Sequence, residues 1–312
     1  MNLRQLAYGL LSYVPGIPEA IYRGTGGSSS AEYCYCIWLR HLVLAGQGGM
    51  PALPKVVAEL GPGDSIGVGL AALLSGAERY LAVDAMAHAD PASNLQVFDG
   101  LVALFRARAP IPDQIRFPEH IIELDSYVFP SALLPEAQLR AALAPDRVAW
   151  LREVVAGVQS APGVVDYRPT GEGPNAEREF ADLVLSNAVL EHVADLRGTY
   201  RITAEWLRPG GHASHQIDFR SHGLFHAWDG HWACPDWLWR LFVGKRDYLL
   251  NREPLSTHRK LATDCGFEER LLLRHARSPE AVRVAPRFRG METADRTTDT
   301  AYMLLRKTRA AA

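Results

Sequence analysis

The sequence predicts an α/β fold built on a mostly parallel sheet, and three observations predict it. The run KVVAEL (55–60) is short, apolar and followed by a glycine-rich loop, which is typical of a buried strand. The next segment, IGVGLAALLSGA (66–77), predicts a helix, and RYLAVDA (79–85) predicts a second strand. A strand, a loop, a helix and a strand in this order begin a parallel α/β unit.

The composition indicates one large domain with an elaboration, or one domain with a small second one. The chain has 312 residues and 48% of them are hydrophobic, which is enough for a sizeable core. The net charge of -2, without a long run of like charge, argues against generic nucleic-acid binding. The four cysteines form no C-x-x-C pair, so we expect no disulfide framework and a reducing, cytoplasmic location.

Two helices are expected before the first strand. The apolar stretch in the first twenty residues is broken by glycine and proline, is too short to span a membrane and lacks a clear cleavage site. We expect a helix packed on the domain, with a peripheral membrane contact as the alternative. A second helix is predicted from residue 31 to about Ala45, because Ser29 and Glu32 have capping-box spacing and Gly46 follows.

The remaining strands follow in the second half of the chain. The segment FADLVLSNAVLEHV (180–193) predicts a buried strand that runs into a helix. A helix closed by Pro-Gly-Gly is then predicted in TYRITAEWLRPGG (199–211). Further strands are predicted in GVVDYRPTG (163–171), HASHQIDF (212–219), FEERLLLRHAR (267–277) and DTAYMLLRKT (299–308).

The interval between Asp84 and Ala181 is longer than one crossover helix needs. Residues 94–109 and 135–158 have helical patterns, so we infer an inserted helical segment around residues 110–160. A second insertion, rich in His and Trp, is expected over residues 219–260. We therefore expect a helical cap over residues 1–50 and one domain with two insertions over residues 51–312.

The glycine loop after the first strand does not fit a phosphate ligand. A P-loop needs a Lys and a Ser or Thr after its last glycine, and this loop has neither in place. A dinucleotide fingerprint needs a third glycine, but after Gly61 and Gly63 that position is Ile66. An acid, Glu59, precedes the loop and suits a cationic, zwitterionic tail such as that of S-adenosylmethionine. A second acid, Asp84, ends the next strand, where a carboxylate can accept hydrogen bonds from a ribose diol.

These segments resemble the class I S-adenosylmethionine-dependent methyltransferases in the order of their motifs. The sequence Glu59-Leu60-Gly61-Pro62-Gly63-Asp64 resembles the first motif, and Asp84 resembles the ribose-binding acid. The segments 181–193 and 206–219 are similar to the fourth-strand and fifth-strand motifs. The resemblance covers most of residues 55–219 and departs from the motif at its third glycine position, which is Ser65. It implies a Rossmann-like seven-stranded sheet with its last strand antiparallel.

The resemblance also implies a cofactor, S-adenosylmethionine, and roles for the matched residues. The loop would contact the methionine moiety, Asp84 the ribose, and Asp166 or Tyr167, expected after the third strand, the adenine edge. Ser186 and Asn187 would line the cofactor tail. The expected cofactor-binding set is Glu59, Gly61, Gly63, Asp64, Ser65, Asp84, Ala85, Asp166, Tyr167, Ser186 and Asn187.

The His- and Trp-rich segment past the fifth strand is the candidate acceptor site, and three interpretations compete. In the first, the segment is an acceptor pocket with a His or Asp as base, since a neutral hydroxyl is a weak nucleophile. In the second, it binds a metal that lowers the hydroxyl pKa, although no compact signature such as H-E-x-x-H is present. In the third, it is a packed helical lid without a ligand. Because residues alternate along a strand, we expect His212, Ser214 and Gln216 on one face and Ala213, His215 and Ile217 on the other.

We choose His215 as base, Asp218 as its orienter and His192 as a further catalytic candidate, and assign no metal ligands. A looser resemblance over residues 211–267 is to a subgroup associated with bacterial polysaccharide and glycan pathways, and would make the acceptor a sugar hydroxyl. It rests on scattered polar positions that include Ser256. The expected substrate-binding residues are His222, His231, Trp232, Asn251 and Arg252.

The sequence thus predicts a methyltransferase acting on an oxygen of a glycan or small molecule. A non-catalytic protein that binds S-adenosylmethionine in a regulatory or scaffold role is a second hypothesis. A nicotinamide-dependent oxidoreductase is a third, disfavoured by the incomplete G-x-G-x-x-G. The expected partner is a small-molecule or glycan acceptor, with no nucleic acid and no transmembrane segment.

Overall fold

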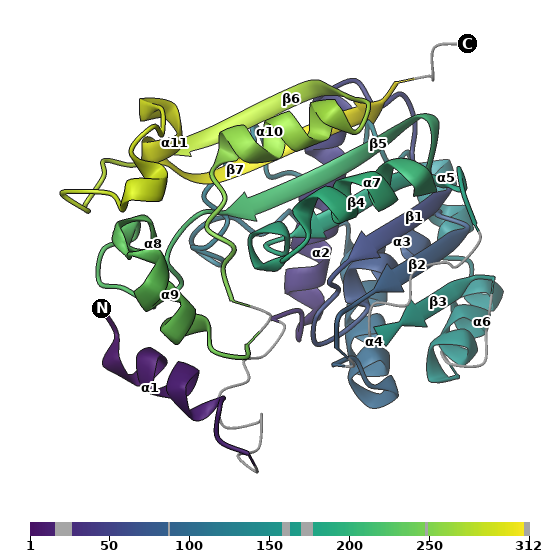
Figure 1. The fold of residues 1–312 in the computed structure, drawn as a ribbon. Coiled ribbons are helices and arrows are strands. Elements are labelled where there is room, and N and C mark those ends of the chain that lie inside the picture. The colour runs from purple at the N-terminus through teal and green to yellow at the C-terminus, as the bar shows by residue number, and fades with distance from the viewer. Residues whose placement is uncertain (16–26, 87, 158–162, 170–176, 247–248, 309–312) are drawn as a thin grey trace.

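The computed structural model describes residues 1–15, 27–86, 88–157, 163–169, 177–246 and 249–308. Residues 16–20 of the N-terminal stretch and residues 170–171 of the strand predicted over 163–171 lie outside this part of the chain. The described residues form one seven-stranded sheet in the order β3-β2-β1-β4-β5-β7-β6 (Figure 1). The strands are β1 (Val56–Leu60), β2 (Arg79–Val83), β3 (Val165–Arg168), β4 (Ala181–Asn187), β5 (Leu207–Asp218), β6 (Phe267–Ala276) and β7 (Thr298–Lys307).

The direction of the strands confirms the expected mostly parallel sheet. Strands β1 to β5 pair in parallel, whereas β7 pairs antiparallel with both β5 and β6. The last strand in sequence is therefore antiparallel, as predicted. The central strands are buried on both faces, which explains their nearly continuous apolar runs.

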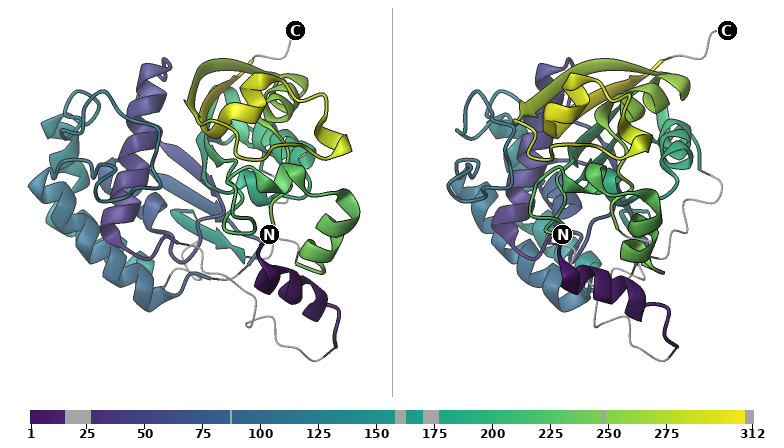
Figure 2. Two further views of the ribbon diagram at one scale, coloured as in Figure 1. Left: turned by 90° about the vertical axis from the view of Figure 1, so that its left-hand side faces the viewer. Right: turned by 60° about the vertical axis from the view of Figure 1, so that its left-hand side comes forward.

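Helices cover both faces of the sheet (Figures 1 and 2). One core lies between the sheet and the helices α2 (Ala31–Gln47), α3 (Gly67–Ser75) and α4 (Pro91–Ala107). The other lies between the sheet and the helices α7 (Leu196–Trp206) and α10 (Leu255–Asp264). Residues of β5 divide as the alternation predicts, since Ala213 and Ile217 pack in the second core while Ser214 bonds toward α2.

The two expected insertions carry short helices. Between β2 and β3, α5 (Glu136–Ala142) and α6 (Pro145–Ala156) extend the α4 side of the molecule. After β5 come α8 (Gly230–Ala233) and α9 (Asp236–Val243), and α11 (Thr293–Thr297) precedes β7. The first helix, α1 (Leu3–Leu11), packs on α9 and not on α2, as Figure 2 shows. Residues 1–50 therefore do not form one cap.

Three local expectations need correction. The cap of α2 is Ser30, whose Oγ accepts a hydrogen bond from the Tyr33 amide, and not Ser29. Asp166 and Tyr167 lie within β3 and not after it. Strand β5 begins at Leu207, before the Pro-Gly-Gly turn, because its pairing with β4 shifts register between Ala181 and Leu183.

The four cysteines are free thiols, which confirms the expected lack of a disulfide framework. Among the described helices, none has the length and the apolar character that crossing a membrane requires.

The close approach of α3 to β2 gives a first prediction. A Cβ added at Gly69 would lie 2.1 Å from the ring of Tyr80, which is fully buried. We expect Gly69→Ala to lower the free energy of unfolding by about 1–3 kcal/mol through overpacking, despite a gain in helix propensity of about 1 kcal/mol. Urea unfolding measures the change. Gly290→Ala, where a Cβ meets nothing within 4 Å, is the control and should unfold like the wild type. Equal stability of Gly69→Ala and the control would contradict the close packing.

Candidate cofactor and acceptor site

The candidate residues gather where the parallel strands end. In the register of the sheet, Glu59 pairs with Leu185 across β1 and β4, and Ser186 pairs with His215 across β4 and β5. Leu60 of β1 pairs with Val83 of β2, so the loops that follow these two strands are neighbours. This carboxyl edge is where open α/β sheets bind their ligands.

The glycine loop takes a backbone conformation that favours glycine. Gly61 has a φ of 65° and Gly63 a φ of 79°, both in the left-handed region. A Cβ at Gly61 would also lie 2.7 Å from a methyl group of Val189. The loop therefore turns sharply between β1 and α3, directly against the segment that follows β4.

Ser65, at the third glycine position, serves the fold and not a ligand. Its side chain is fully buried; its Oγ donates to the Ser28 carbonyl at 2.5 Å and accepts from the Gly67 amide at 3.1 Å. The Ser28 hydroxyl in turn accepts from the Ser65 amide at 2.9 Å and donates to the Pro62 carbonyl at 2.5 Å. We therefore correct the expectation that the Ser65 side chain contacts the cofactor, since it ties the loop to the start of α2. Beside it, Asp64 accepts from the Gly27 amide at 2.9 Å.

Glu59 lies inside the sheet edge and not on an open surface. Only 3% of the residue is exposed, and its carboxylate accepts a hydrogen bond from the Tyr80 hydroxyl. Burial raises the pKa of Glu59 to about 8, although the bond from Tyr80 opposes this shift. The Glu59 side chain therefore links β1 to β2 just before the glycine loop.

Asp84 joins the loops that follow β1 and β2. Its carboxylate accepts from the Gly63 amide at 3.1 Å and from the Met86 amide at 3.2 Å. The residue is half-buried, and burial raises its pKa above the usual value against these bonds. The exposed Ala85 follows it. Tyr167 fixes the same loop from β3, since its hydroxyl donates to the Met86 carbonyl at 3.2 Å.

Asp166 is turned to another partner. Its carboxylate accepts from the Arg168 side chain, with the Nε contact at 3.0 Å. At the end of β4, Asn187 donates to the Tyr33 hydroxyl at 3.2 Å, so the start of α2 reaches over this edge.

The preferred base, His215, is placed where it cannot reach an acceptor. Its side chain is fully buried, and its Nδ1 lies 2.8 Å from the Ser186 Oγ. Burial lowers its pKa to about 3, so the ring is neutral near pH 7. His215 and Asp218 are three positions apart on one strand and point to opposite faces. The expected pairing of base and orienter is therefore wrong, and His215 holds Ser186.

Asp218 has a different histidine as its partner. Its Oδ2 lies 3.2 Å from Nε2 of His222, and it accepts a forked pair of bonds from Arg220 with Nη2 at 2.6 Å. Burial alone would raise the pKa of Asp218, but the bonds from His222 and Arg220 outweigh it and hold this pKa well below its usual range. His222 has a φ of 46°, an uncommon value for a residue other than glycine.

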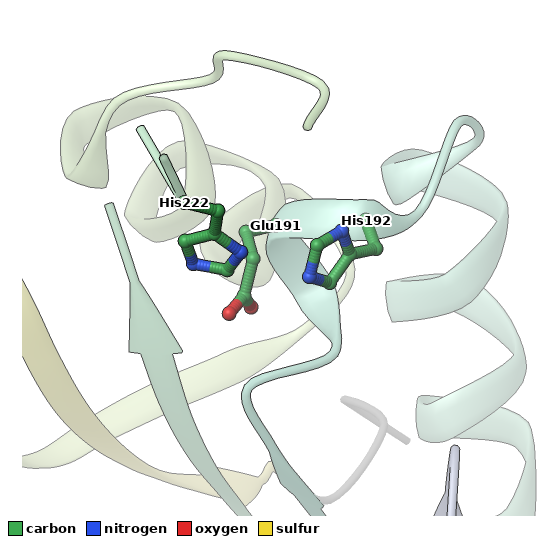
Figure 3. Close-up of side chains that lie close together, drawn as sticks. All are labelled: Glu191, His192 and His222. Atoms are coloured by element: carbon green, nitrogen blue, oxygen red, sulfur yellow. The ribbon is translucent and has the colours of Figure 1, made fainter. Parts of the chain in front are cut away.

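Sequence reasoning missed Glu191, which the fold brings beside two of the expected histidines. Glu191 and His192 belong to η4 (Leu190–His192), and His222 follows β5. Figure 3 shows the Glu191 carboxylate between the two imidazole rings, whose centroids are 5.0 Å apart. Glu191 is 4% exposed, and burial raises its pKa well above the usual value. The only sequence signal was its position next to His192.

Three of the expected substrate-binding residues are interior and need correction. His231, Trp232 and Arg252 are between 1% and 3% exposed. The Trp232 indole donates to the Arg252 carbonyl at 3.0 Å, and the Arg252 guanidinium donates to the Cys234 carbonyl at 2.8 Å. These side chains hold the second insertion together, because buried polar groups need protein partners.

Asn251, also expected to contact the substrate, braces η4 instead. Its side-chain amide donates to the carbonyls of Leu190 at 2.7 Å and Val193 at 2.9 Å. The backbone amide of Asn251 donates to the Glu191 backbone carbonyl at 2.7 Å. The residue thus fixes the helix that carries Glu191 and His192.

A cavity of about 610 Å³ lies away from these residues, near the starts of β4 and β5. Most of the charged side chains that line it form ion pairs, such as Arg197 with Asp264 at 3.1 Å and Lys307 with Glu179 at 3.0 Å. It does not share the carboxyl edge with the glycine loop. It is lined by Arg178, Glu179, Arg197, Arg201, Ala204, Glu205, Asp264, Cys265 and Lys307.

The strand order, with β7 antiparallel, is that of the class I methyltransferase sheet. The chain has the class I methyltransferase fold. No protein-family model and no curated protein matches the sequence. Among solved structures, it is similar to an S-adenosylmethionine-dependent methyltransferase from Mesorhizobium loti, at 13% identity over 82% of this chain and 92% of that one, with a TM-score of 0.40. It is also similar to phosphoethanolamine N-methyltransferase 2 of Haemonchus contortus, in complex with S-adenosyl-L-methionine, at 13% identity over 87% of this chain and 53% of that one, with a TM-score of 0.42.

The buried histidines predict a loss of stability in mild acid. Burial lowers the pKa of five of them to about 3. Below about pH 6.5 these rings are therefore protonated in the unfolded chain but stay neutral in the folded chain, which favours unfolding. Each contributes up to about 1.4 kcal/mol per pH unit. Glu59 and Glu191 act in the opposite direction, since their raised pKa values favour the folded state as the pH falls. The five are His41, His120, His215, His231 and His258.

The histidines outnumber the glutamates, so we expect the free energy of unfolding to fall by about 2–4 kcal/mol between pH 6.5 and pH 5.5. Urea unfolding at the two pH values measures this. Equal stability at both would show that the rings are not held neutral in the folded protein.

Proposed function

We propose that this chain is an S-adenosylmethionine-dependent methyltransferase that acts on an oxygen atom of its acceptor. The observation that carries the proposal is the link between the glycine loop and Asp84. The Gly63 amide donates to the Asp84 carboxylate at 3.1 Å, which joins the loop after β1 to the acid after β2 at the carboxyl edge. This arrangement suits a nucleoside with an aminoacyl tail, because it offers a carboxylate for the ribose diol and main chain without side chains for the tail.

The residues at this edge fit S-adenosylmethionine in their chemistry. A carboxylate offers about four lone-pair positions, and the two bonds from the Gly63 and Met86 amides leave Asp84 with acceptor capacity for a diol. Gly61 and Gly63 present main chain without a Cβ. Asn187 lies at the end of β4 and donates a hydrogen bond to the Tyr33 hydroxyl. When bound, S-adenosylmethionine supplies an electrophilic methyl group on a sulfonium centre.

The remaining residues of the edge serve the acceptor. Glu191, His192 and His222 gather next to the end of β4, and Asp218 and Asn251 hold them. An imidazole at this place can remove the proton of an acceptor hydroxyl, a task that His215 cannot perform from the interior. Ser28, just before α2, bonds this segment to the glycine loop. The sugar or glycan class of the acceptor rests on the resemblance of residues 211–267.

The cofactor site is tested by binding. We expect wild-type protein to bind S-adenosylmethionine in titration calorimetry and Asp84→Asn to bind it about 10–100-fold more weakly, since a hydrogen bond to a charged group is worth about 1.5–3 kcal/mol. Asp99→Asn removes an exposed carboxylate of α4, paired with Arg152, and is the matched control. Undetectable binding by the wild type, or equal weakening in both variants, would refute the proposed site.

The acceptor side is tested by turnover. With a panel of sugars and small phenols, we expect a product heavier by one methylene and stable as a methyl ether. His192→Gln should lower kcat by about 100-fold or more if this ring handles the hydroxyl proton, with the affinity for S-adenosylmethionine unchanged. His226→Gln, at an exposed histidine of the loop after β5, is the control. Methylation on nitrogen or carbon, or full activity of His192→Gln, would contradict this part.

A further inference from the structure

We propose that Glu191, His192 and His222 form a binding site for one divalent transition-metal ion of the zinc type. Each residue offers one ligand atom, and these atoms all lie within 4.8 Å of one another. The site joins η4 after β4 to the loop after β5, so only the folded chain assembles it (Figure 3). The sequence contains no compact metal signature, which is why sequence reasoning assigned none.

The Glu191 carboxylate is incompletely satisfied by the protein. Its Oε1 accepts from the Asp218 amide at 3.3 Å, whereas its Oε2 is buried and has no hydrogen-bond partner among the described residues. The nearby Arg220 guanidinium donates its hydrogen bonds to Asp218. A buried carboxylate oxygen without a partner is costly, and a bound cation is one of the few groups that satisfies it.

His222 already has the outer partner that a metal-binding histidine requires. Histidines that bind metals usually direct their other ring nitrogen to a carboxylate, which fixes the tautomer and the ring. Nε2 of His222 lies 3.2 Å from the Asp218 Oδ2, so in the proposed site Nδ1 of that ring is the nitrogen that remains for the ion. Asp218 is in turn fixed by Arg220, with Nη2 at 2.6 Å. Asp218 is thus a positioning residue for the proposed site.

The donor set selects the class of ion. Two imidazoles and one carboxylate suit zinc, cobalt and similar ions, whereas magnesium and calcium prefer oxygen ligands alone. Ligand atoms around a tetrahedral zinc ion at about 2.1 Å lie about 3.4 Å apart, so the three side chains need only small rotations. His192 is half-buried and His222 is exposed, so a water molecule or an acceptor can approach this side of the site as a fourth ligand. Three protein ligands with one open position are typical of catalytic zinc sites.

An ion at this place would lower the pKa of an acceptor hydroxyl that binds to the open position, so His192 would promote loss of the hydroxyl proton as a metal ligand and not as a free base. This consequence rests on the proposed function, but the binding of the metal does not. The metal site can therefore be tested without S-adenosylmethionine and without an acceptor.

The experiment titrates Zn²⁺ into metal-free protein against a competing chelator, and follows Co²⁺ by the visible absorption of a tetrahedral complex. We expect one ion per chain. Glu191→Gln and His222→Asn should each weaken Zn²⁺ binding at least tenfold, and Asp218→Asn about 10–100-fold. Asparagine at position 222 tolerates the left-handed backbone. His226→Asn changes an exposed histidine of the same loop and should leave the affinity unchanged.

Urea unfolding of each variant confirms that it is folded, and Asp84→Asn should bind Zn²⁺ as the wild type does. A wild type that takes up no ion would overturn the proposal, as would unchanged affinity in Glu191→Gln and His222→Asn. Equal weakening by His226→Asn would show adsorption to surface histidines and overturn it as well. If the wild type binds Zn²⁺ but not S-adenosylmethionine, the result would support the metal site and refute the methyltransferase proposal.

Discussion

The pairing of β4 with β1 on one side and β5 on the other is the constraint on which both halves of the site depend. Parallel strands end at one edge, so this pairing places the glycine loop, η4 and the loop after β5 together. The register also sets which side chains reach the edge. A slip of one residue in β4 would exchange the faces of Ser186 and Asn187, and would break the contact between Ser186 and His215.

Burial explains why histidines and tryptophans were poor guides to the acceptor site. The second insertion has only short helices. Aromatic side chains of this insertion, such as Trp239 and Phe242, pack on one another and on α1 and form a small core of their own. Trp232 instead packs in the larger core beneath the sheet, and its ring centroid lies 4.5 Å from that of the buried His231. A sequence rich in these residues fits a ligand platform and a packed lid equally well. Only the fold separates the exposed His222 from the buried His231.

The sheet and the first motif were predictable because their signals are local. Apolar runs of five to seven residues fix β1, β2 and β4, and the left-handed turns at Gly61 and Gly63 need glycine whatever surrounds them. The role of Ser65 was not predictable, since its partner Ser28 is 37 positions away. The same holds for Asn251 and Leu190, whose contact spans 61 positions.

The two halves of the site are held by different parts of the chain. The cofactor half depends on Ser28, Asp84 and the loop between β1 and α3, all of which lie in the first third of the sequence. The proposed acceptor half depends on contacts that η4 makes with Asp218 at the end of β5 and with Asn251 of the second insertion. Because these ties share no residue, a change in the insertion can reshape the acceptor half while the glycine loop keeps its geometry. In the proposed methyltransferase we therefore expect residue changes over 219–260 to alter acceptor choice, and changes before residue 90 to alter the affinity for the cofactor.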